Sequence, residues 1–193
     1  LAPRIRFNDR MMLTYVWKIT DRTRERGWAF LDTLESGELT SIFGMRENTE
    51  LTQVLNLSYI FTNRMSLTTR VRHAWSQVVY HSFHELPTSG SLSPAAYNTS
   101  APPSDYDLNY NAWSIDMVYR WNFAPGSEVN IVWKNQLFQQ TEAGQAPGFE
   151  LPQTYGDNFE QMLESGFINS LSFRVISFID YSRFKQGLRG FEK

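Results

Sequence analysis

Three oxygen-bearing side chains in the middle of the chain are spaced as calcium ligands would be. Asp105, Asp107 and Asn109 form an Asp-x-Asp-x-Asn series, which places an oxygen at alternate positions as at the start of a calcium loop. The sixth position is Tyr110 instead of glycine, and a strand is expected to begin there. The three residues are therefore candidate calcium ligands, and a polar loop entering a strand is the alternative.

Two histidines and a glutamate lie just before that series. His81, His84 and Glu85 offer imidazole and carboxylate groups, which are zinc ligands. Their spacing is not the His-Glu-x-x-His of metalloproteases, and on a strand His81 and His84 would point to opposite faces. A solvated loop is the better interpretation, and no cofactor is expected.

A hydrolase would need a nucleophile and a base within hydrogen-bond reach. Ser82 beside His81, with Asp105 or Asp107 opposite, could supply both. Nothing in the sequence specifies that geometry, so we expect a protein that is not an enzyme.

The elements that must position these side chains are strands. Apolar residues alternate with polar ones in eight segments, which indicates eight strands. They cover residues 4–19, 26–33, 38–46, 50–61, 66–80, 110–123, 128–138 and 169–181.

The clearest segments form a hairpin around Ala124-Pro125-Gly126-Ser127. Large apolar side chains occupy the odd positions and charges the even ones, so the two kinds face opposite sides of a sheet. The aromatic residues expected to face lipid are Trp17, Trp75, Trp113, Tyr119, Trp121, Phe123, Trp133 and Tyr181. His73, on the same side, is a candidate contact with another subunit.

The opposite side carries charges and leans basic. In a barrel these side chains would face the lumen, where they could favour anionic solutes. They are Arg70, Arg72, Asp116, Arg120, Glu128, Lys134, Arg174 and Asp180. The alternative is a plugged, salt-bridged interior that conducts nothing.

Composition narrows the class of protein. The chain has 193 residues, a net charge of −2 and no run rich in Lys and Arg, so a nucleic-acid partner is not expected. Cysteine is absent, which excludes disulfides and Cys-based zinc sites. No run approaches the roughly 20 apolar residues of a membrane-spanning helix. The chain begins at Leu1, so we expect a mature chain or the end of a longer one.

The connections alternate in length. Tight or short turns at 32–37, 61–65 and 124–127 are expected at one end of the strands, and long segments at 81–109 and 139–168 at the other. Outer-membrane barrels have short periplasmic turns and long external loops. A short helix is expected at 157–165.

Alternation alone also suits a soluble, lipocalin-like barrel, whose apolar face points inward. The apolar sets of the last five strands contain no Asp, Glu, Lys or Arg, and aromatic residues recur near strand ends. Because a charge facing lipid is costly, these features favour an all-β, antiparallel transmembrane barrel of at least eight strands.

Several segments resemble a known family. They are Tyr59 to Met65, Arg72 to Trp75, Ile115 to Glu128, and Asn169 through Tyr181, with the turn Trp121-Asn122-Phe123-Ala124-Pro125-Gly126-Ser127 the most specific. The chain resembles a Bacteroidetes-type outer-membrane family of unknown function, whose members often carry a family-nine carbohydrate-binding domain ahead of a C-terminal barrel. The resemblance implies an outer-membrane location and the C-terminal portion of a larger barrel.

The functional expectation follows from the strand pattern and from the family resemblance. Residues 1–182 are expected to form barrel strands and loops, and 183–193 a short periplasmic tail. The expected role is a surface binding or passage module embedded in outer-membrane lipid, and the resemblance implies a link to carbohydrate uptake. The alternative is a structural subunit that packs against other outer-membrane proteins through its apolar side or long loops.

Overall fold

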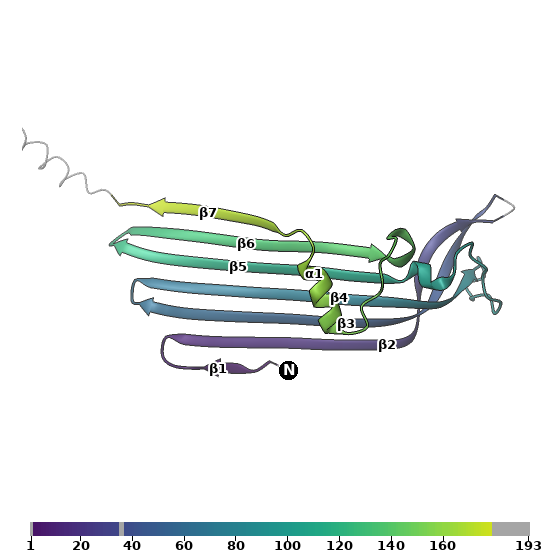
Figure 1. Ribbon diagram of the computed structural model, residues 1–193, viewed down its shortest axis with the longest axis horizontal. Helices are drawn as coiled ribbons and strands as arrows, with labels where there is room; N and C mark the ends of the chain where they lie inside the picture. The colour runs from purple at the N-terminus through teal and green to yellow at the C-terminus, as the bar shows by residue number, and fades with distance from the viewer. Residues whose placement is uncertain (1, 35–36, 179–193) are drawn as a thin grey trace, which may run out of the picture.

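A single antiparallel sheet makes up most of the molecule in the computed structural model, which describes residues 2–34 and 37–178 (Figure 1). Each strand pairs with the next along the chain, and the order is β1 to β7. The strands are β1 (Arg4–Arg6), β2 (Met11–Thr33), β3 (Leu39–Thr62), β4 (Met65–Leu86), β5 (Leu108–Ala124), β6 (Ser127–Glu142) and β7 (Ile168–Ile176). The connections contain η1 (Pro103–Tyr106), η2 (Ala143–Gln145) and the helix α1 (Tyr155–Leu163).

The expected all-β, antiparallel class is confirmed. Within the described part of the chain the sheet has seven strands and is not closed into a barrel, because β1 and β7 are not paired with each other. The segment 169–181, expected to be the last strand, forms β7 up to Ile176, and its final residues lie outside the described chain.

The expected division of the first half into short strands is wrong. Segments 4–19 and 26–33 are replaced by β1 and one long strand, β2, while 38–46 and 50–61 belong to one strand, β3. The polar residues at 20–25 pair with the polar residues at 46–50, and Arg22 forms an ion pair with Glu50 at 2.7 Å. This pairing continues both strands where the alternation of apolar residues stops.

Two irregularities in β2 explain why alternation fails there. The register with β3 shifts between Arg22 and Glu25, and again between Trp28 and Phe30. Arg24, inside the first shift, has a φ of 56°, a left-handed value uncommon for a residue other than glycine. Each bulge exchanges which residues of β2 face each side of the sheet.

The ends of the sheet differ from the expected arrangement in one respect. Turns at 7–10, 62–65 and 124–127 lie at one end, and the long connections 87–107 and 143–167 at the other, which we call the loop end. The turn at 32–37 lies at the loop end and not with the tight turns, because β3 is one strand instead of two. Residues 81–86, expected in a loop, belong to β4.

Register places the odd-numbered residues of neighbouring strands side by side. Leu13 pairs with Leu57, Tyr59 with Leu67, and Tyr119 with both Leu67 and Ile131. In the same way Asp116 lies between Arg70 and Lys134. The predicted separation of apolar and charged side chains onto two faces is therefore continuous from β2 to β7.

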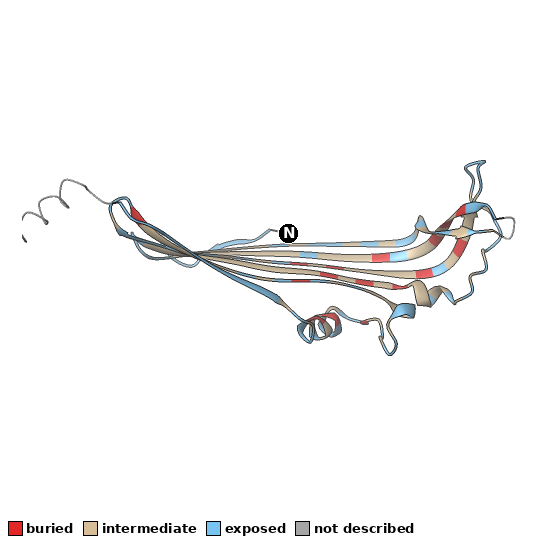
Figure 2. Ribbon diagram, turned by 90° about the horizontal axis from the view of Figure 1, so that it is seen from above, coloured by how far each residue is buried: buried red, intermediate tan, exposed pale blue. Residues whose placement is uncertain are grey.

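Buried residues gather toward the loop end, where the strands bend (Figure 2). Ile42, Tyr80 and Phe83 form a small core on the side of the even residues of β3, packed against Phe30 and Tyr106. A Cβ at Gly44 would lie 2.4 Å from the Tyr80 ring, so only glycine fits at this position without a clash. The face that carries charged side chains toward the tight turns thus carries an apolar core at the loop end.

The expected helix at 157–165 is present as α1, shifted by two residues. Thr154 caps its first turn, since the Thr154 hydroxyl accepts from Asp157 N and the Asp157 carboxylate accepts from Thr154 N. The helix lies against one face of the sheet (Figures 1 and 2). Its contacts, described below, show that this is the face of the aromatic residues.

Candidate functional site

The charged face has its centre at Asp116 on β5. Its carboxylate forms an ion pair with Arg72 of β4 and lies 4.0 Å from the Lys134 ammonium of β6. Arg72 also donates to the Ser114 hydroxyl at 3.1 Å, and Arg70 is the register partner of Asp116. One carboxylate is thus surrounded by three cationic side chains, which leaves the centre of this face with a net positive charge.

The other charged residues of this face form a second row nearer the turns. Arg120 donates to Asn130 at 3.3 Å, and Asn130 donates to Glu128 at 2.9 Å. Arg174 of β7 is the register partner of Asn130 and is exposed. The described members of the predicted charged set therefore share one face, while Asp180 lies outside the described residues.

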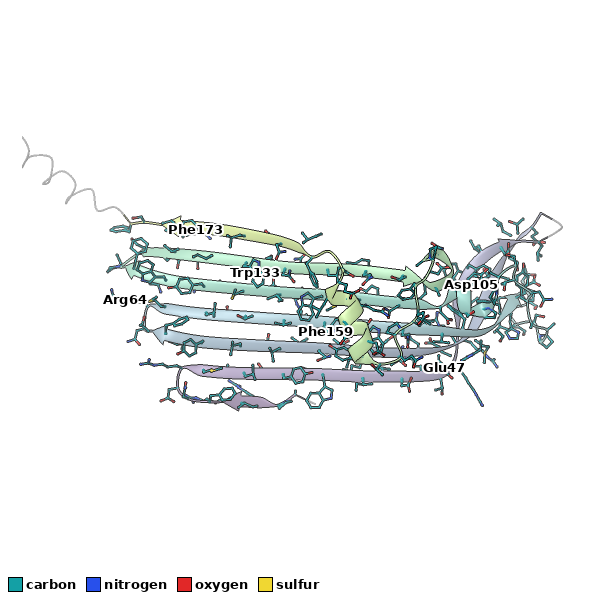
Figure 3. The ribbon with its side chains drawn as sticks, in the orientation of Figure 1. Glu47, Arg64, Asp105, Trp133, Phe159 and Phe173 are labelled. Carbon is teal, nitrogen blue, oxygen red and sulfur yellow. The ribbon has the colours of Figure 1, made fainter. Side chains whose placement is uncertain are left out.

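The opposite face carries an apolar belt, which we define as the odd-numbered residues of 11–19, 51–59, 67–75, 113–123, 129–137 and 169–175. Many of its side chains are open to solvent, with Leu171 73% and Phe173 66% exposed (Figure 3 labels Phe173 and Trp133). Of the predicted aromatic set, Trp17, Tyr119, Trp121, Phe123 and Trp133 lie in this belt. Tyr181 lies outside the described chain.

Two predicted belt residues are covered by α1. Trp75 is only 7% exposed because the Tyr155 ring packs 5.9 Å from it, centroid to centroid, so the prediction that it faces outward is wrong. Trp113 packs against Phe159 at 6.0 Å (Figure 3 labels Phe159). The helix thus covers the part of the belt nearest the loop end.

Polar side chains within the belt are paired with aromatic ones. Asn135 accepts from the Trp113 indole N–H at 3.0 Å, Asn169 accepts from the Trp133 indole at 3.3 Å, and the Tyr15 hydroxyl donates to Gln53. A polar group without such a partner is costly in an apolar surrounding. These pairs remove that cost without adding charge to the face.

A buried polar cluster joins α1 to the sheet. His73 is 3% exposed and contacts the Tyr155 hydroxyl through Nδ1 at 2.9 Å and Asn111 Oδ1 through Nε2 at 3.1 Å. Since Asn111 Oδ1 can only accept, Nε2 carries the ring proton. Burial beneath α1 also contradicts the expectation that His73 contacts another subunit.

Two of the three candidate calcium ligands, Asp107 and Asn109, are committed to other contacts. Asp107 accepts from Tyr80 N at 2.7 Å, while Asn109 accepts from the Trp75 indole at 2.8 Å and donates to Asn158 at 3.0 Å. Burial raises the pKa of the Asp107 carboxyl above its ordinary value. The calcium site is therefore not formed, and no group of three or more His, Asp or Glu side chains in 2–34 and 37–178 is arranged to hold a metal ion.

The proposed zinc and hydrolase groups are also separated. His81 faces Glu47, with 3.4 Å between Nε2 and Oε1, and Glu85 accepts from the Thr40 hydroxyl at 3.1 Å. Ser82 pairs with His84 instead of His81, at 3.1 Å between Oγ and Nε2. The expected trio of Ser82, His81 and an aspartate is not assembled.

A hollow of about 550 Å³ surrounds Ser82 and His84 at the loop end, and sequence reasoning did not find it. Its lining includes Arg24, Arg26, Met45 and Leu92. The signal for the Ser82–His84 pair was their i, i+2 spacing, which places both on one face of a strand. The prediction of a loop at 81–109 hides this spacing, because Ser82 and His84 share a face only on a strand.

Comparisons with known proteins add one finding. The family model described as a domain of unknown function (DUF5916) matches residues 1–188. Neither the curated proteins nor the solved structures include a match. In the described part of the chain, no helix is long and apolar enough to cross a membrane.

Proposed function

The chain belongs to the family described as a domain of unknown function (DUF5916), and from its geometry we propose that it is an outer-membrane β-barrel segment acting as a surface binding or passage module. The apolar belt would face lipid, and the charged face would line the lumen. The long connections at the loop end would form the surface that meets solutes or partners.

The observation that carries the proposal is the uncharged belt. It continues across six paired strands, β2 to β7, without one Asp, Glu, Lys or Arg. A water-exposed face of this size would gain nothing from excluding charge, whereas one Arg or Lys facing the bilayer midplane costs about 2–4 kcal/mol. The hydrogen bonds that occupy Gln53, Asn135 and Asn169 fit the same surrounding.

Insertion into lipid sets a further requirement on the two edges of the sheet. Unpaired backbone N–H and C=O groups are too costly in hydrocarbon, so both edges need strand partners. We propose that strands beyond those described complete the barrel. The net positive centre of the charged face, around Arg72, Asp116 and Lys134, favours an anionic solute in its lumen. The carbohydrate link rests on the family resemblance alone.

A matched pair of substitutions tests the membrane location. Ile131 lies in the belt between Tyr119 and Phe173, and its neighbour Val132 lies on the charged face. Ile131→Arg should remove the chain from the outer-membrane fraction or abolish its heat-modifiable migration, and Val132→Arg should do neither. Equal behaviour of the two variants would contradict the proposal. Recovery of the unaltered chain in the soluble fraction would favour the soluble barrel.

A further inference from the structure

The hollow around Ser82 and His84 opens on the same side of the sheet as the apolar belt. Met45 and Glu47 line it, and they alternate in phase with Leu51 and Leu55, because β3 has no extra residue of its own between positions 45 and 55. Glu47 is labelled near the loop end in Figure 3. The hollow therefore lies just beyond the belt, within about four residues of its last apolar side chain on β3.

The hydrogen bonds of His84 fix which nitrogen can act as a base. Its Nδ1 faces two main-chain carbonyl oxygens, Ser93 O at 3.0 Å and Ala95 O at 3.2 Å. Carbonyl oxygens only accept, so Nδ1 carries the proton, and Nε2 of the neutral ring accepts from the Ser82 hydroxyl. A base oriented by a third group against a hydroxyl is the arrangement that activates a serine nucleophile.

Two arginines supply positive charge beside this pair. Register aligns Arg26, Met45 and Ser82 in one row across β2, β3 and β4, so the backbones of Arg26 and Ser82 lie about 10 Å apart, two strand spacings. Arg24 is held in its left-handed conformation next to them. Neither guanidinium has an ion-pair partner within the described chain. Glu47, the one carboxylate in the lining, contacts His81.

We propose that Ser82 and His84 form the nucleophile and base of an esterase acting on anionic amphiphiles, with the ester bonds of phospholipids as the substrate class. Arg24 and Arg26 bind the phosphate. The acyl chains extend along Met45 toward the belt. This proposal departs from the expectation that the chain is not an enzyme. Only the choice of phospholipids as substrates rests on the proposed membrane location.

The reaction has two balanced steps. Ser82 Oγ attacks the ester carbonyl while His84 Nε2 takes the hydroxyl proton, and the alcohol leaves with that proton as the acyl-serine forms. Water then attacks the acyl-serine, its proton passing to His84 Nε2. Ser82 recovers a proton from His84, and the fatty acid is released. No oxidant, metal or co-reactant other than water is needed.

Covalent labelling tests the nucleophile directly. A long-chain fluorophosphonate should label the full chain in detergent, and peptide mass spectrometry should place the label on Ser82. Ser82→Ala should abolish labelling, and His84→Gln should slow it by about 10²–10⁴-fold. Ser170→Ala, which changes an exposed serine on β7 outside the hollow, should label at the unaltered rate. Absence of labelling, or undiminished labelling of Ser82→Ala, would overturn the proposal.

Kinetics in mixed micelles test the substrate class. Phosphatidylglycerol should be hydrolysed with a lower KM than an uncharged diacylglycerol of the same chain length. The double variant Arg24→Gln/Arg26→Gln should raise KM for phosphatidylglycerol by about tenfold and leave kcat unchanged, because the arginines bind charge away from the ester. Equal KM values for the two lipids in the unaltered chain would overturn the phosphate assignment.

Folding and location are controlled separately. Thermal unfolding by circular dichroism should give the same midpoint for His84→Gln and the unaltered chain, so that loss of labelling reports chemistry. Both assays use detergent and do not require membrane insertion. Labelling at Ser82, together with equal behaviour of Ile131→Arg and Val132→Arg, would support the esterase and contradict the membrane location. Absence of labelling, together with loss of only Ile131→Arg from the membrane fraction, would contradict the esterase and support the membrane location.

Discussion

Asn158 of α1 and Asn111 of β5 exchange two side-chain hydrogen bonds, each 2.8 Å between amide nitrogen and oxygen. Both side chains are almost completely buried, at 0% and 1% exposure. Asn109 donates to the same oxygen of Asn158 at 3.0 Å. This reciprocal amide pair fixes the position of the helix, because loss of either amide would leave a buried N–H group of the other without its acceptor.

Asn158→Ala should therefore release α1 from the sheet. The change removes the partner of two buried amides, each worth about 1–3 kcal/mol when unsatisfied, so we expect a loss of about 2–4 kcal/mol in docking free energy. Hydrogen exchange in α1 should rise while the strands stay protected. Asn98→Ala, at an exposed loop position, provides the control. Unchanged exchange in Asn158→Ala would show that the aromatic contacts hold the helix alone.

The burial of Asp107 predicts a pH dependence of stability. Its pKa is raised in the folded chain, so the folded state binds this proton more tightly than the unfolded state. The contribution to stability is fully present below the ordinary aspartate pKa and is lost as pH rises through the raised value. Asp107→Asn keeps an acceptor for Tyr80 N. It should therefore reduce the change of the denaturant midpoint with pH between the ordinary aspartate pKa and the raised value.

Glu164→Gln is the control for that measurement, since Glu164 is exposed at the C-terminal end of α1 and is not among the groups that shift the pKa of Asp107. Its midpoints should follow the unaltered chain at each pH. If Asp107→Asn keeps the full pH dependence, another group is responsible for it.

Gly44 predicts a steric effect at the loop-end core. An alanine Cβ there would lie 2.4 Å from the Tyr80 ring, which is itself held against Phe83. Gly44→Ala should lower the free energy of unfolding by about 1–3 kcal/mol, the usual cost of overpacking. Gly166→Ala, where a Cβ meets nothing within 4 Å, should leave it unchanged. Comparable losses in both variants would contradict the packing argument.

The hairpin of β5 and β6 could be predicted from sequence because its alternation has no interruption. Trp113 pairs with Leu137 and Trp121 with Val129, as the odd positions require. β2 and β3 could not be predicted as long strands. Their middle parts are polar, and what continues them is pairing with each other, including the ion pair of Arg22 with Glu50.

The candidate sites show the same limit. The helix α1 was predicted only two residues from its actual position, but its packing on Trp75 and Asn111 depends on contacts between residues more than 40 positions apart. The calcium series Asp105, Asp107 and Asn109 has suitable spacing, yet Asp107 accepts from the backbone of Tyr80 and Asn109 donates to Asn158. Ligand spacing along a chain does not reveal which donors the fold has already used.

Asp116 predicts how the charged face responds to loss of the acid at its centre. Asp116→Asn removes the partner of Arg72 and the nearest carboxylate to Lys134, while Arg70 stays alongside. If this face lines a lumen, the gain of one positive charge should shift the reversal potential in planar bilayers toward greater anion selectivity. Stability should fall by no more than about 1 kcal/mol, because these side chains are partly exposed. Glu142→Gln, at the loop-end terminus of β6, alters charge equally and should shift selectivity less. A shift toward cations, or none in a conducting barrel, would place the charged face outside the lumen.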